Sequence, residues 1–199
     1  MSIHYKSEVL MSKKRIVVAI SGASGTIYAI NLLKKLKEYP DIETHVVMSD
    51  WAHENLKLEL DMSHDEFASL CDVLYPNKDL GAKIASGSFL TDGMVIVPAS
   101  MKTVAGITCG FSDNLIGRAA DVALKEQRKL IIVPRETPLN TIHLENLTKL
   151  SRMGVQVIPP VPAFYNHPKT LQDIIDHNTA KLLDALHIRN DYAGRWDGD

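Results

Sequence analysis

The 199-residue sequence predicts an α/β fold in which a doubly wound parallel sheet forms the middle of three layers. Two observations lead to this prediction. Short runs rich in valine and isoleucine recur along the chain, as is typical of strands that are buried on both faces of a parallel sheet. Segments with helical periodicity lie between these runs, and alternating strands and helices imply right-handed crossovers within one sheet.

The first half of the chain supplies three of the five predicted strands. These strands are residues 15–20, 43–48 and 94–97. The first strand is followed by four apolar residues at helical spacing, Ile27, Ile30, Leu33 and Leu36. The sequence SHDE, which begins at Ser63, has the form of a capping box and predicts a short helix through Leu70.

The second half of the chain supplies the other two strands, residues 130–133 and 155–158, and most of the helices. A helix is predicted over residues 104–110, and an amphipathic helix follows Asn114. Residues 142–153 form another helix, which Gly154 terminates. A final helix is predicted over residues 170–186, where Thr170 is suited to cap the N-terminus.

The length of the chain favours one domain, predicted over residues 13–188. A second methionine, Met11, resembles an alternative start, so residues 1–12 are expected to be a flexible extension. Residues 189–199 form a polar tail that contains one tryptophan. Residues 159–168 contain four prolines and therefore predict a stiff, irregular loop.

The composition excludes several classes of protein. A net charge of −2 argues against non-specific nucleic-acid binding, which needs a basic surface. No apolar run approaches the roughly 20 residues that cross a bilayer. The N-terminus lacks the apolar core of a signal peptide. The two cysteines, Cys71 and Cys109, have no CxxC spacing and indicate reduced thiols, so a soluble cytoplasmic protein is predicted.

Three predicted strands end in small or hydroxylated residues. SGASG, residues 21–25, follows the first strand, Ser49 follows the second, and PASMKT, residues 98–103, follows the third. Small residues let a ligand approach the backbone, and helix N-termini attract anions. Each segment alone could be a turn or a helix cap, but the three together favour a mononucleotide site at a switch point of the sheet.

The segment from Asn114 to Glu136 carries the most informative charges. Arg118, Asp121 and Lys125 share one helix face, and the next strand ends at Pro134-Arg135-Glu136. Arg118 and Lys125 are suited to bind a phosphate, and Arg135 could hold a second phosphate or contact a flavin. Glu136 is either an ion-pair partner of Arg135 or an acid–base group. A solvated helix face followed by a loop ion pair is the simpler alternative.

Other residues give weaker indications of chemistry. The eight histidines show no HExxH or other zinc spacing, so no metal site is predicted. Neither serine-rich turn has the GxSxG form of an α/β-hydrolase. Trp51 is expected to lie in the core rather than to stack on a ligand.

Six segments together resemble the UbiX-like flavin prenyltransferases. They are SGASG, PASMKT, NLIGRAADVALKE, LIIVPRE, IHLEN and PAFYNHP, in the order of the family's motifs. The resemblance runs from residue 14 to residue 186, and RAADVALKE with VPRE and IHLEN is its most specific part. It implies a flavodoxin-like fold and an enzyme that joins dimethylallyl phosphate to reduced FMN. The bonds form at flavin N5 and C6 without a metal, and the product is the prenylated FMN cofactor of UbiD-type decarboxylases.

The resemblance also implies roles for individual residues. FMN would be bound by Gly22, Ala23, Ser24, Ser49, Ser100, Met101, Lys102, Thr103 and Arg135. The donor phosphate would be bound by Arg118, Lys125, Tyr165 and Lys181. The catalytic set would be Lys125 together with the proton-handling positions Ser24, Glu59 and Glu136. The family's large homo-oligomers, such as a dodecamer, imply that some of these groups meet across subunit interfaces.

Two positions depart from the family pattern. Lys181 stands where many relatives have an arginine, which keeps the charge but loses the bidentate fork. Leu80 lies where some relatives have a tryptophan, so one aromatic wall of the prenyl pocket is in question. Tyr165 and Trp196 are the aromatic residues that could replace it.

Three other functions compete with prenyl transfer. An FMN-dependent cysteine decarboxylase would carry PASANT, whereas this chain has Lys102 in place of the asparagine. A non-catalytic flavin-binding subunit of an aromatic acid decarboxylase would leave Arg118, Lys125 and Lys181 without a ligand. Direct decarboxylation of an aromatic acid would need the flavin itself to accept the carbanion electrons.

Overall fold

A six-stranded parallel sheet forms the centre of the protein, as the computed structural model of residues 13–192 shows. The strand order is β3-β2-β1-β4-β5-β6, and every neighbouring pair is parallel. The predicted α/β fold is therefore confirmed, while residues 1–12 and Trp196 lie outside the described part. The strands are β1 (Lys14–Ile20), β2 (Ile42–Met48), β3 (Val73–Pro76), β4 (Gly93–Ala99), β5 (Leu130–Pro134) and β6 (Gln156–Val157).

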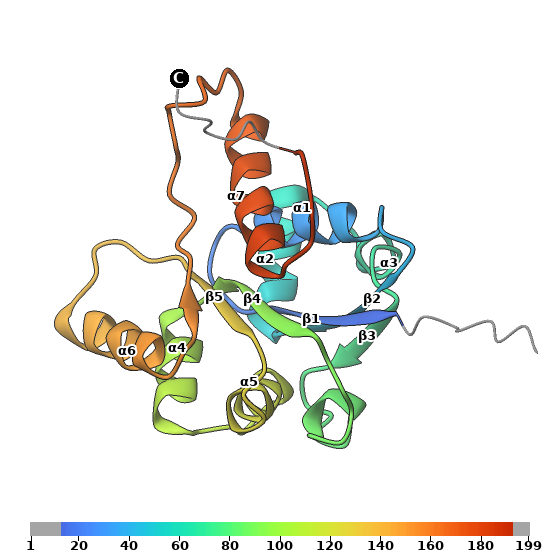
Figure 1. The fold of residues 1–199 in the computed structure, drawn as a ribbon, viewed down its shortest axis with the longest axis vertical. Helices are drawn as coiled ribbons and strands as arrows, with labels where there is room; N and C mark the ends of the chain where they lie inside the picture. Colours follow the sequence, from blue (N-terminus) through green and yellow to red (C-terminus); the bar gives the residue numbers. More distant parts are fainter. Residues whose placement is uncertain (1–12, 193–199) are drawn as a thin grey trace, which may run out of the picture.

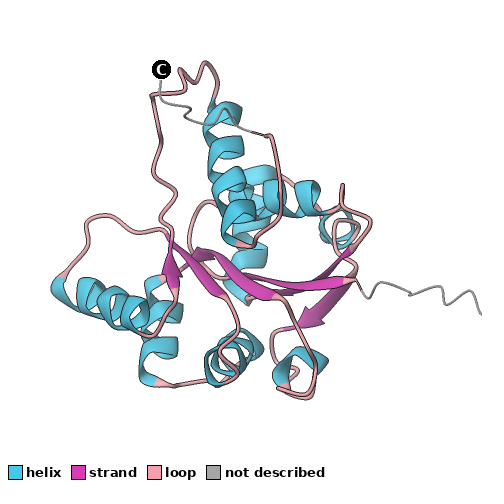
Figure 2. Cartoon of the chain, in the orientation of Figure 1, coloured by secondary structure: helices cyan, strands magenta, loops and turns pink. Residues whose placement is uncertain are grey.

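Helices cover both faces of this sheet (Figures 1 and 2). One face carries α1 (Thr26–Leu36), α2 (Asp50–Leu60), α3 (His64–Ala68) and α7 (Leu171–Ala185). The other face carries the short 3₁₀ helix η1 (Lys83–Ala85), α4 (Met101–Cys109), α5 (Leu115–Lys125) and α6 (Thr141–Arg152). The strands point their C-terminal ends toward one edge of the sheet, where open α/β sheets bind ligands.

Each face of the sheet has its own apolar core. Val18 and Ile20 of β1 pack with Leu33 of α1 and Leu182 of α7 on one face. The alternate residues of β1, Val17 and Ala19, belong to the core on the opposite face. Burying a leucine or isoleucine side chain stabilises a fold by about 1.5–3 kcal/mol, so both cores hold the sheet in place. This burial on both faces is the reason that the strand sequences are apolar throughout rather than alternating.

Two elements were absent from the sequence prediction. β3 pairs only with β2 at the edge of the sheet, and its residues are half-buried or exposed, so its sequence lacks the apolar run of a central strand. In α2 only Ala52 and Leu56 are buried, which leaves little helical periodicity in its sequence.

Several element boundaries differ from the prediction, among them β4, which runs from Gly93 to Ala99 rather than over 94–97. α4 begins at Met101 rather than at residue 104, because the Ser100 hydroxyl accepts a hydrogen bond from the Thr103 N–H and caps the helix there. β6 is two residues long rather than four. The capping box at Ser63 and the N-cap at Thr170 are confirmed, and Thr170 forms a capping box with Asp173 as well.

The proline-rich segment 159–168 forms no helix or strand. It leaves the sheet after β6 and runs beside α7 before it enters that helix at its N-terminus (Figure 1). Tyr165 lies in this segment and is half exposed. Within residues 13–192, no helix is long and apolar enough to cross a membrane.

Candidate functional site

The ends of β1 and β4 are tied together by one serine. The Ser21 hydroxyl donates a hydrogen bond to the carbonyl oxygen of Pro98 at 3.0 Å and accepts one from the Ser100 N–H at 2.7 Å. The chain continues from β1 to β2 on one side and from β4 to β5 on the other, so this point is where the strand order reverses. The sequence-predicted crevice therefore lies at the switch point of the sheet.

Two of the predicted serines also cap helices at this edge. Ser49 accepts a hydrogen bond from the Ala52 N–H at 3.2 Å and begins α2, and Ser100 accepts one from the Thr103 N–H at 3.3 Å and begins α4. The Ser49 N–H donates to the Ile20 carbonyl oxygen at 2.9 Å, which places the start of α2 beside the end of β1. Helix capping and ligand binding are compatible, because the first turn of a helix has further N–H groups that face outward.

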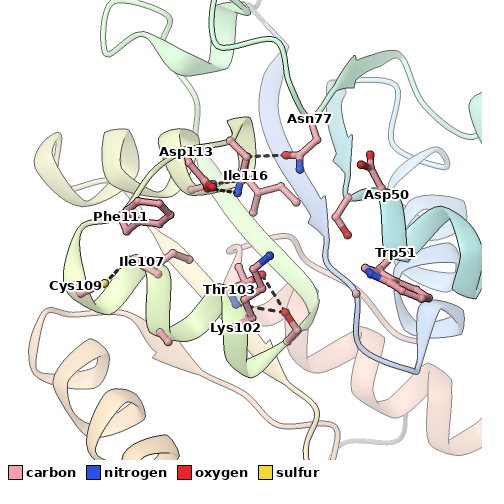
Figure 3. Close-up of a pocket in the computed structure, with 17 residues that line it drawn as sticks. Asp50, Trp51, Asn77, Lys102, Thr103, Ile107, Cys109, Phe111, Asp113 and Ile116 are labelled. Atoms are coloured by element: carbon pink, nitrogen blue, oxygen red, sulfur yellow. Dashed lines mark hydrogen bonds between the residues drawn. The ribbon is translucent and has the colours of Figure 1, made fainter.

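A cavity of about 530 Å³ opens at this switch point (Figure 3). Its volume lies in the usual range for small-molecule sites, which is about 300–1,000 Å³. Five of the sequence-predicted FMN residues line it: Gly22, Ser49, Ser100, Lys102 and Thr103. They come from the ends of β1, β2 and β4, so the structure brings together the three segments that the sequence singled out.

Several lining residues were missed by the sequence reasoning. Trp51 was expected in the core, but its side chain is 71% exposed and lines the cavity, so that expectation is wrong. The reason is its place at the start of α2, directly after the capping serine, which turns it toward the edge of the sheet. Phe111 and Ile116 line the side of the cavity formed by α4, α5 and the turn between them (Figure 3).

Asn77 supports the far side of the cavity by holding the start of α5. Its carbonyl oxygen accepts from the Leu115 N–H at 2.8 Å, and its side-chain oxygen accepts from the Ile116 N–H at 3.2 Å. Asn114 caps the same helix through the Gly117 N–H at 3.0 Å. Contacts of this kind join segments that are distant in the sequence, so no local pattern indicates them.

The other predicted FMN residues lie beside the cavity rather than in its lining. Ala23 and Met101 are each 8% exposed and pack into the protein, whereas the Ser24 side chain is exposed. Arg135 is exposed at the end of β5, and its N–H donates to the Ala99 carbonyl oxygen at 3.3 Å. This bond places the Arg135 backbone next to Ser100.

Glu136 is exposed and forms no ion pair with Arg135 among the described residues. One of its carboxylate oxygens instead accepts a hydrogen bond from the Thr137 N–H at 3.1 Å. The loop ion pair that the sequence left open is therefore absent from this part of the structure. Both side chains are available to a ligand at the end of β5.

Glu59 reaches from the end of α2 to the SGASG turn. Its carboxylate accepts hydrogen bonds from the Gly25 N–H at 3.0 Å, the Thr26 N–H at 3.0 Å and the Thr26 hydroxyl at 2.7 Å. Partial burial raises the pKa of Glu59, but these bonds and one from Ser24 outweigh that effect, so the pKa lies below its ordinary value. Glu59 is thus a carboxylate at neutral pH that joins Ser24 to the start of α1.

The residues predicted to bind the donor phosphate fall into two groups. Arg118 and Lys125 line a polar hollow of about 460 Å³ together with residues 85–88 and Glu126. Arg118 is paired with Asp121 at 2.7 Å, and Lys125 is paired with Glu126. The shared helix face that the sequence predicted for Arg118, Asp121 and Lys125 is present on α5.

Tyr165 and Lys181 form the second group, which lies at α7. The Tyr165 ring packs edge-on against His177 of that helix at 5.8 Å between ring centroids. Burial and the nearby charge of Lys181 lower the pKa of His177, which is therefore neutral at pH 7. Because α7 and α5 cover opposite faces of the sheet, one chain does not bring the four phosphate-binding candidates together (Figure 1).

Two further expectations concern the prenyl pocket and metals. Leu80 is 49% exposed and lines neither the cavity nor the polar hollow. Within this chain it therefore does not take the place of the tryptophan that some relatives have. Among the described residues, no group of three or more histidine, cysteine, aspartate or glutamate side chains is arranged to hold a metal ion.

Comparisons with known proteins place this arrangement in a family. The family model described as Flavoprotein matches residues 4–189. The flavin prenyltransferase LpdB of Lactiplantibacillus plantarum is 66% identical over 186 residues, which cover 94% of this chain and 100% of the relative.

Two crystal structures have the same fold, each with a TM-score of 0.91. The first is a dodecameric FMN-dependent UbiX-like decarboxylase from Escherichia coli O157:H7, which is 52% identical over 92% of this chain and 100% of its own. The second is the protein AnUbiX (PadA1) in complex with FMN and dimethylallyl pyrophosphate, which is 44% identical over 94% of this chain and 98% of its own. On this evidence, the protein belongs to the family of UbiX-like flavin prenyltransferases.

Proposed function

We propose that the protein transfers the dimethylallyl group of dimethylallyl phosphate to reduced FMN and so makes prenylated FMN. The observation that carries this proposal is the near full-length identity of 66% to a flavin prenyltransferase. The cavity at the switch point supports it, because its lining comes from the three strand ends to which the resemblance assigns FMN binding. The acceptor would be FMN in its reduced form, which supplies both nucleophilic atoms, N5 and C6.

The residues of the cavity fit a flavin mononucleotide. Lys102 lies in the first turn of α4, where an ammonium group and helix N–H groups together favour a phosphate. Gly22 lets the SGASG turn pack against the start of α2 at the edge of the cavity, since a Cβ atom there would lie 2.7 Å from Cβ of Trp51. Trp51 and Phe111 provide exposed aromatic surface on the same cavity. In this proposal Arg135 contacts the flavin from the end of β5.

Arg118 and Lys125 would stabilise the departing phosphate. Cleavage of the allylic C–O bond transfers negative charge to that phosphate, so preorganised cations lower the barrier. Lys125 would leave Glu126 and bind the phosphate instead. Arg118 would keep the hydrogen bond from its Nε to the Ala85 carbonyl oxygen, at 3.2 Å, and bind the phosphate with its terminal nitrogens. No activated serine or cysteine is required, because the acceptor atoms belong to the flavin.

A complete donor site would require a second subunit. Lys181 belongs to α7, and Tyr165 packs on His177 of the same helix, whereas Arg118 and Lys125 belong to α5 on the opposite face of the sheet. We therefore assign Tyr165 and Lys181 to the neighbouring copy of the chain. The dodecameric relative supports assembly into a homo-oligomer. The loop that carries Tyr165 would then close the pocket and shield the allylic cation from water.

The proton on N5 leaves when the first bond forms, and the released phosphate takes up one proton. The second bond forms when the double bond of the prenyl group takes up a proton and C6 gives one up, so carboxylates would carry protons between these atoms. Glu59 is deprotonated and contacts the SGASG turn; its lowered pKa makes it a weak base, which would pass a proton on rather than retain it. Glu136 is exposed at the end of β5 on the opposite side of the crevice. These positions fit a relay between the two flavin atoms, the prenyl double bond and the released phosphate, with Ser24 between Glu59 and the flavin.

The decisive experiment is anaerobic incubation of the purified protein with reduced FMN and dimethylallyl phosphate, followed by mass spectrometry of the released flavin. A flavin heavier by one five-carbon unit is expected. Unmodified flavin from protein that binds FMN would refute prenyl transfer. A parallel reaction with dimethylallyl pyrophosphate tests which donor is preferred.

A matched pair of variants tests the phosphate contact. Lys125→Ala is expected to bind FMN and to lose at least about tenfold in donor turnover, since one cation of the phosphate site is removed. Lys57→Ala, which removes an exposed lysine from α2, serves as the control. Equal turnover of the two variants would show that Lys125 does not bind the donor phosphate.

The two hypotheses that concern an aromatic acid decarboxylase are tested with the same protein. An aromatic acid incubated with the protein and FMN is expected to release no CO₂ by itself. Addition of an apo UbiD-type decarboxylase together with the reaction products is expected to restore decarboxylation, because we propose such an enzyme as the recipient of prenylated FMN. A cytoplasmic location is part of this proposal, and the two free cysteines, Cys71 and Cys109, are consistent with it.

A further inference from the structure

The polar hollow has one wall that belongs to no predicted site residue. Ala85 and the first three residues of the loop 86–89 form this wall; the loop follows η1 and lies beside α5 (Figure 1). Ser86 and Ser88 are exposed on it, and Gly87 is half-buried. The loop contains no regular element, so contacts from α5 and the turn after it determine its position.

Arg128 makes two of these contacts. One terminal nitrogen donates to the Phe89 carbonyl oxygen at 2.8 Å, and the other donates to the Gly87 carbonyl oxygen. The side chain is half-buried, and its planar guanidinium group suits two acceptors on one segment. Arg118 adds a third contact through the Ala85 carbonyl oxygen at 3.2 Å.

The turn after α5 delivers Arg128 to this loop. α5 ends at Lys125, and Gln127 adopts a left-handed conformation with φ of 52°. The Arg128 N–H then donates back to the Ala123 carbonyl oxygen at 2.8 Å. The turn therefore fixes the backbone of Arg128 while Lys125, three residues earlier, lines the hollow.

The width of the hollow is sensitive to where the loop lies. A Cβ atom on Gly87 would lie 2.2 Å from a carboxylate oxygen of Glu126 and 2.9 Å from Nζ of Lys125. The loop thus touches the Lys125–Glu126 pair, and a shift of a few tenths of an ångström would change the space that an anion can occupy. Carbonyl oxygens also repel a phosphate, and Arg128 holds two of them in hydrogen bonds.

We propose that Arg128 is a positioning residue for the donor phosphate. It holds residues 87–89 so that their carbonyl oxygens do not face the anion and so that Lys125 has room to bind it. This inference rests on the proposed function, because it takes the hollow to be the site of the donor phosphate. Arg128 itself does not contact the donor.

Substitution of Arg128 by methionine tests the proposal in the full-length protein with FMN bound. Arg128→Met is expected to raise KM for dimethylallyl phosphate by about tenfold or more, with a much smaller change in kcat and an unchanged Kd for FMN. Lys129→Met is the matched control, because it removes the adjacent half-buried cation, which contacts His187 instead. A purely structural role would lower activity and stability without this separation of KM from kcat.

Chemical rescue gives a second readout. Arg128→Gly leaves space for the missing group, so millimolar guanidinium is expected to lower KM for the donor toward the wild-type value, whereas equimolar sodium chloride is not. If Arg128→Met does not fold, Arg128→Lys is measured, and a KM raised severalfold is expected because one ammonium group cannot reproduce the two-pronged contact. An unchanged KM in the folded variant overturns the proposal.

Titration calorimetry separates this inference from the proposed function. Dimethylallyl phosphate is titrated into the wild-type and Arg128→Met complexes with FMN. Donor binding by the wild type without prenylation refutes the proposed function and still tests Arg128 through the two Kd values. Equal Kd values refute the role of Arg128, and so does failure of the wild-type complex to bind the donor.

Discussion

At the scale of single residues, the charge of Glu59 is set by the turn that it contacts. Its hydrogen bonds with Thr26 and Gly25 lower its pKa in the folded state below the value of a free glutamate, which is about 4.3. A carboxyl group of this kind stabilises the fold fully above its unfolded pKa. The contribution disappears as the pH falls through the lower, folded pKa.

Glu59→Gln is therefore expected to lower the free energy of unfolding by ~1 kcal/mol at pH 7, because an amide oxygen accepts the same donors less strongly. The difference between variant and wild type should shrink as the pH falls below about 4.3, where the unfolded carboxyl group is protonated. Urea unfolding at pH 7 and at pH 4 measures both values. A difference that does not depend on pH would contradict this account.

Gly87→Ala tests the close contact between the loop and the ion pair. The new Cβ atom must displace Glu126 and Lys125, so KM for dimethylallyl phosphate is expected to rise by about tenfold with little change in stability. Gly81→Ala is the control on the same segment, since its Cβ atom would have no neighbour closer than 3.4 Å. Steady-state kinetics of the two variants with FMN at saturation compare them directly.

Trp51 provides an optical test of the cavity. The chain has two tryptophans, so in a Trp196→Phe background the tryptophan fluorescence comes from Trp51 alone. Flavin bound in the cavity is expected to quench this fluorescence strongly, since aromatic rings in contact stack on one another. Addition of FMN with no change in emission would place the flavin elsewhere.

At the scale of elements, strand ends and helix starts were predictable wherever one local pattern determines them. The apolar runs identified β1, β2, β4 and β5, and the capping serine of SHDE identified α3. β3 and α2 were missed because little of either element is buried, so their sequences carry no strong periodicity.

The candidate site was predictable to the same extent. Ser49 and Ser100 follow apolar strands and were found, whereas Trp51 and Asn77 take part through the position of other elements. The separation of Arg118 from Lys181 depends on which face of the sheet each helix covers. A linear sequence indicates the spacing of α5 and α7 but not the faces that they cover.

The link between β1 and β4 yields a prediction at this scale. Ser21→Ala removes an acceptor from the Ser100 N–H and a donor to Pro98 in a buried position. The free energy of unfolding is expected to fall by ~1–3 kcal/mol, because a buried N–H loses its partner. Ser69→Ala, which removes an exposed hydroxyl at the end of α3, should change it by less than about 0.5 kcal/mol. Urea unfolding curves compare the two variants, and equal losses would contradict the proposed link.

At the scale of the whole molecule, the placement of charge on two faces predicts complementation between defective chains. Arg118→Ala and Lys181→Ala are each expected to lose donor turnover when expressed alone. Co-expression should restore about a quarter of wild-type activity if each site takes these residues from two different subunits, because a quarter of the sites then receive both intact side chains. Absence of any recovery in mixed oligomers would assign both residues to one subunit.

The position of α5 and α7 on opposite faces has a consequence for how activity begins. A newly made chain already contains the whole cavity that we propose for the flavin, but its polar hollow holds only two of the four groups assigned to the donor. Flavin uptake would then precede assembly, and donor cleavage would wait for it. The reactive allylic cation would arise only in a site that neighbouring copies have enclosed. Assembly of the oligomer would therefore control when cleavage of the donor can start.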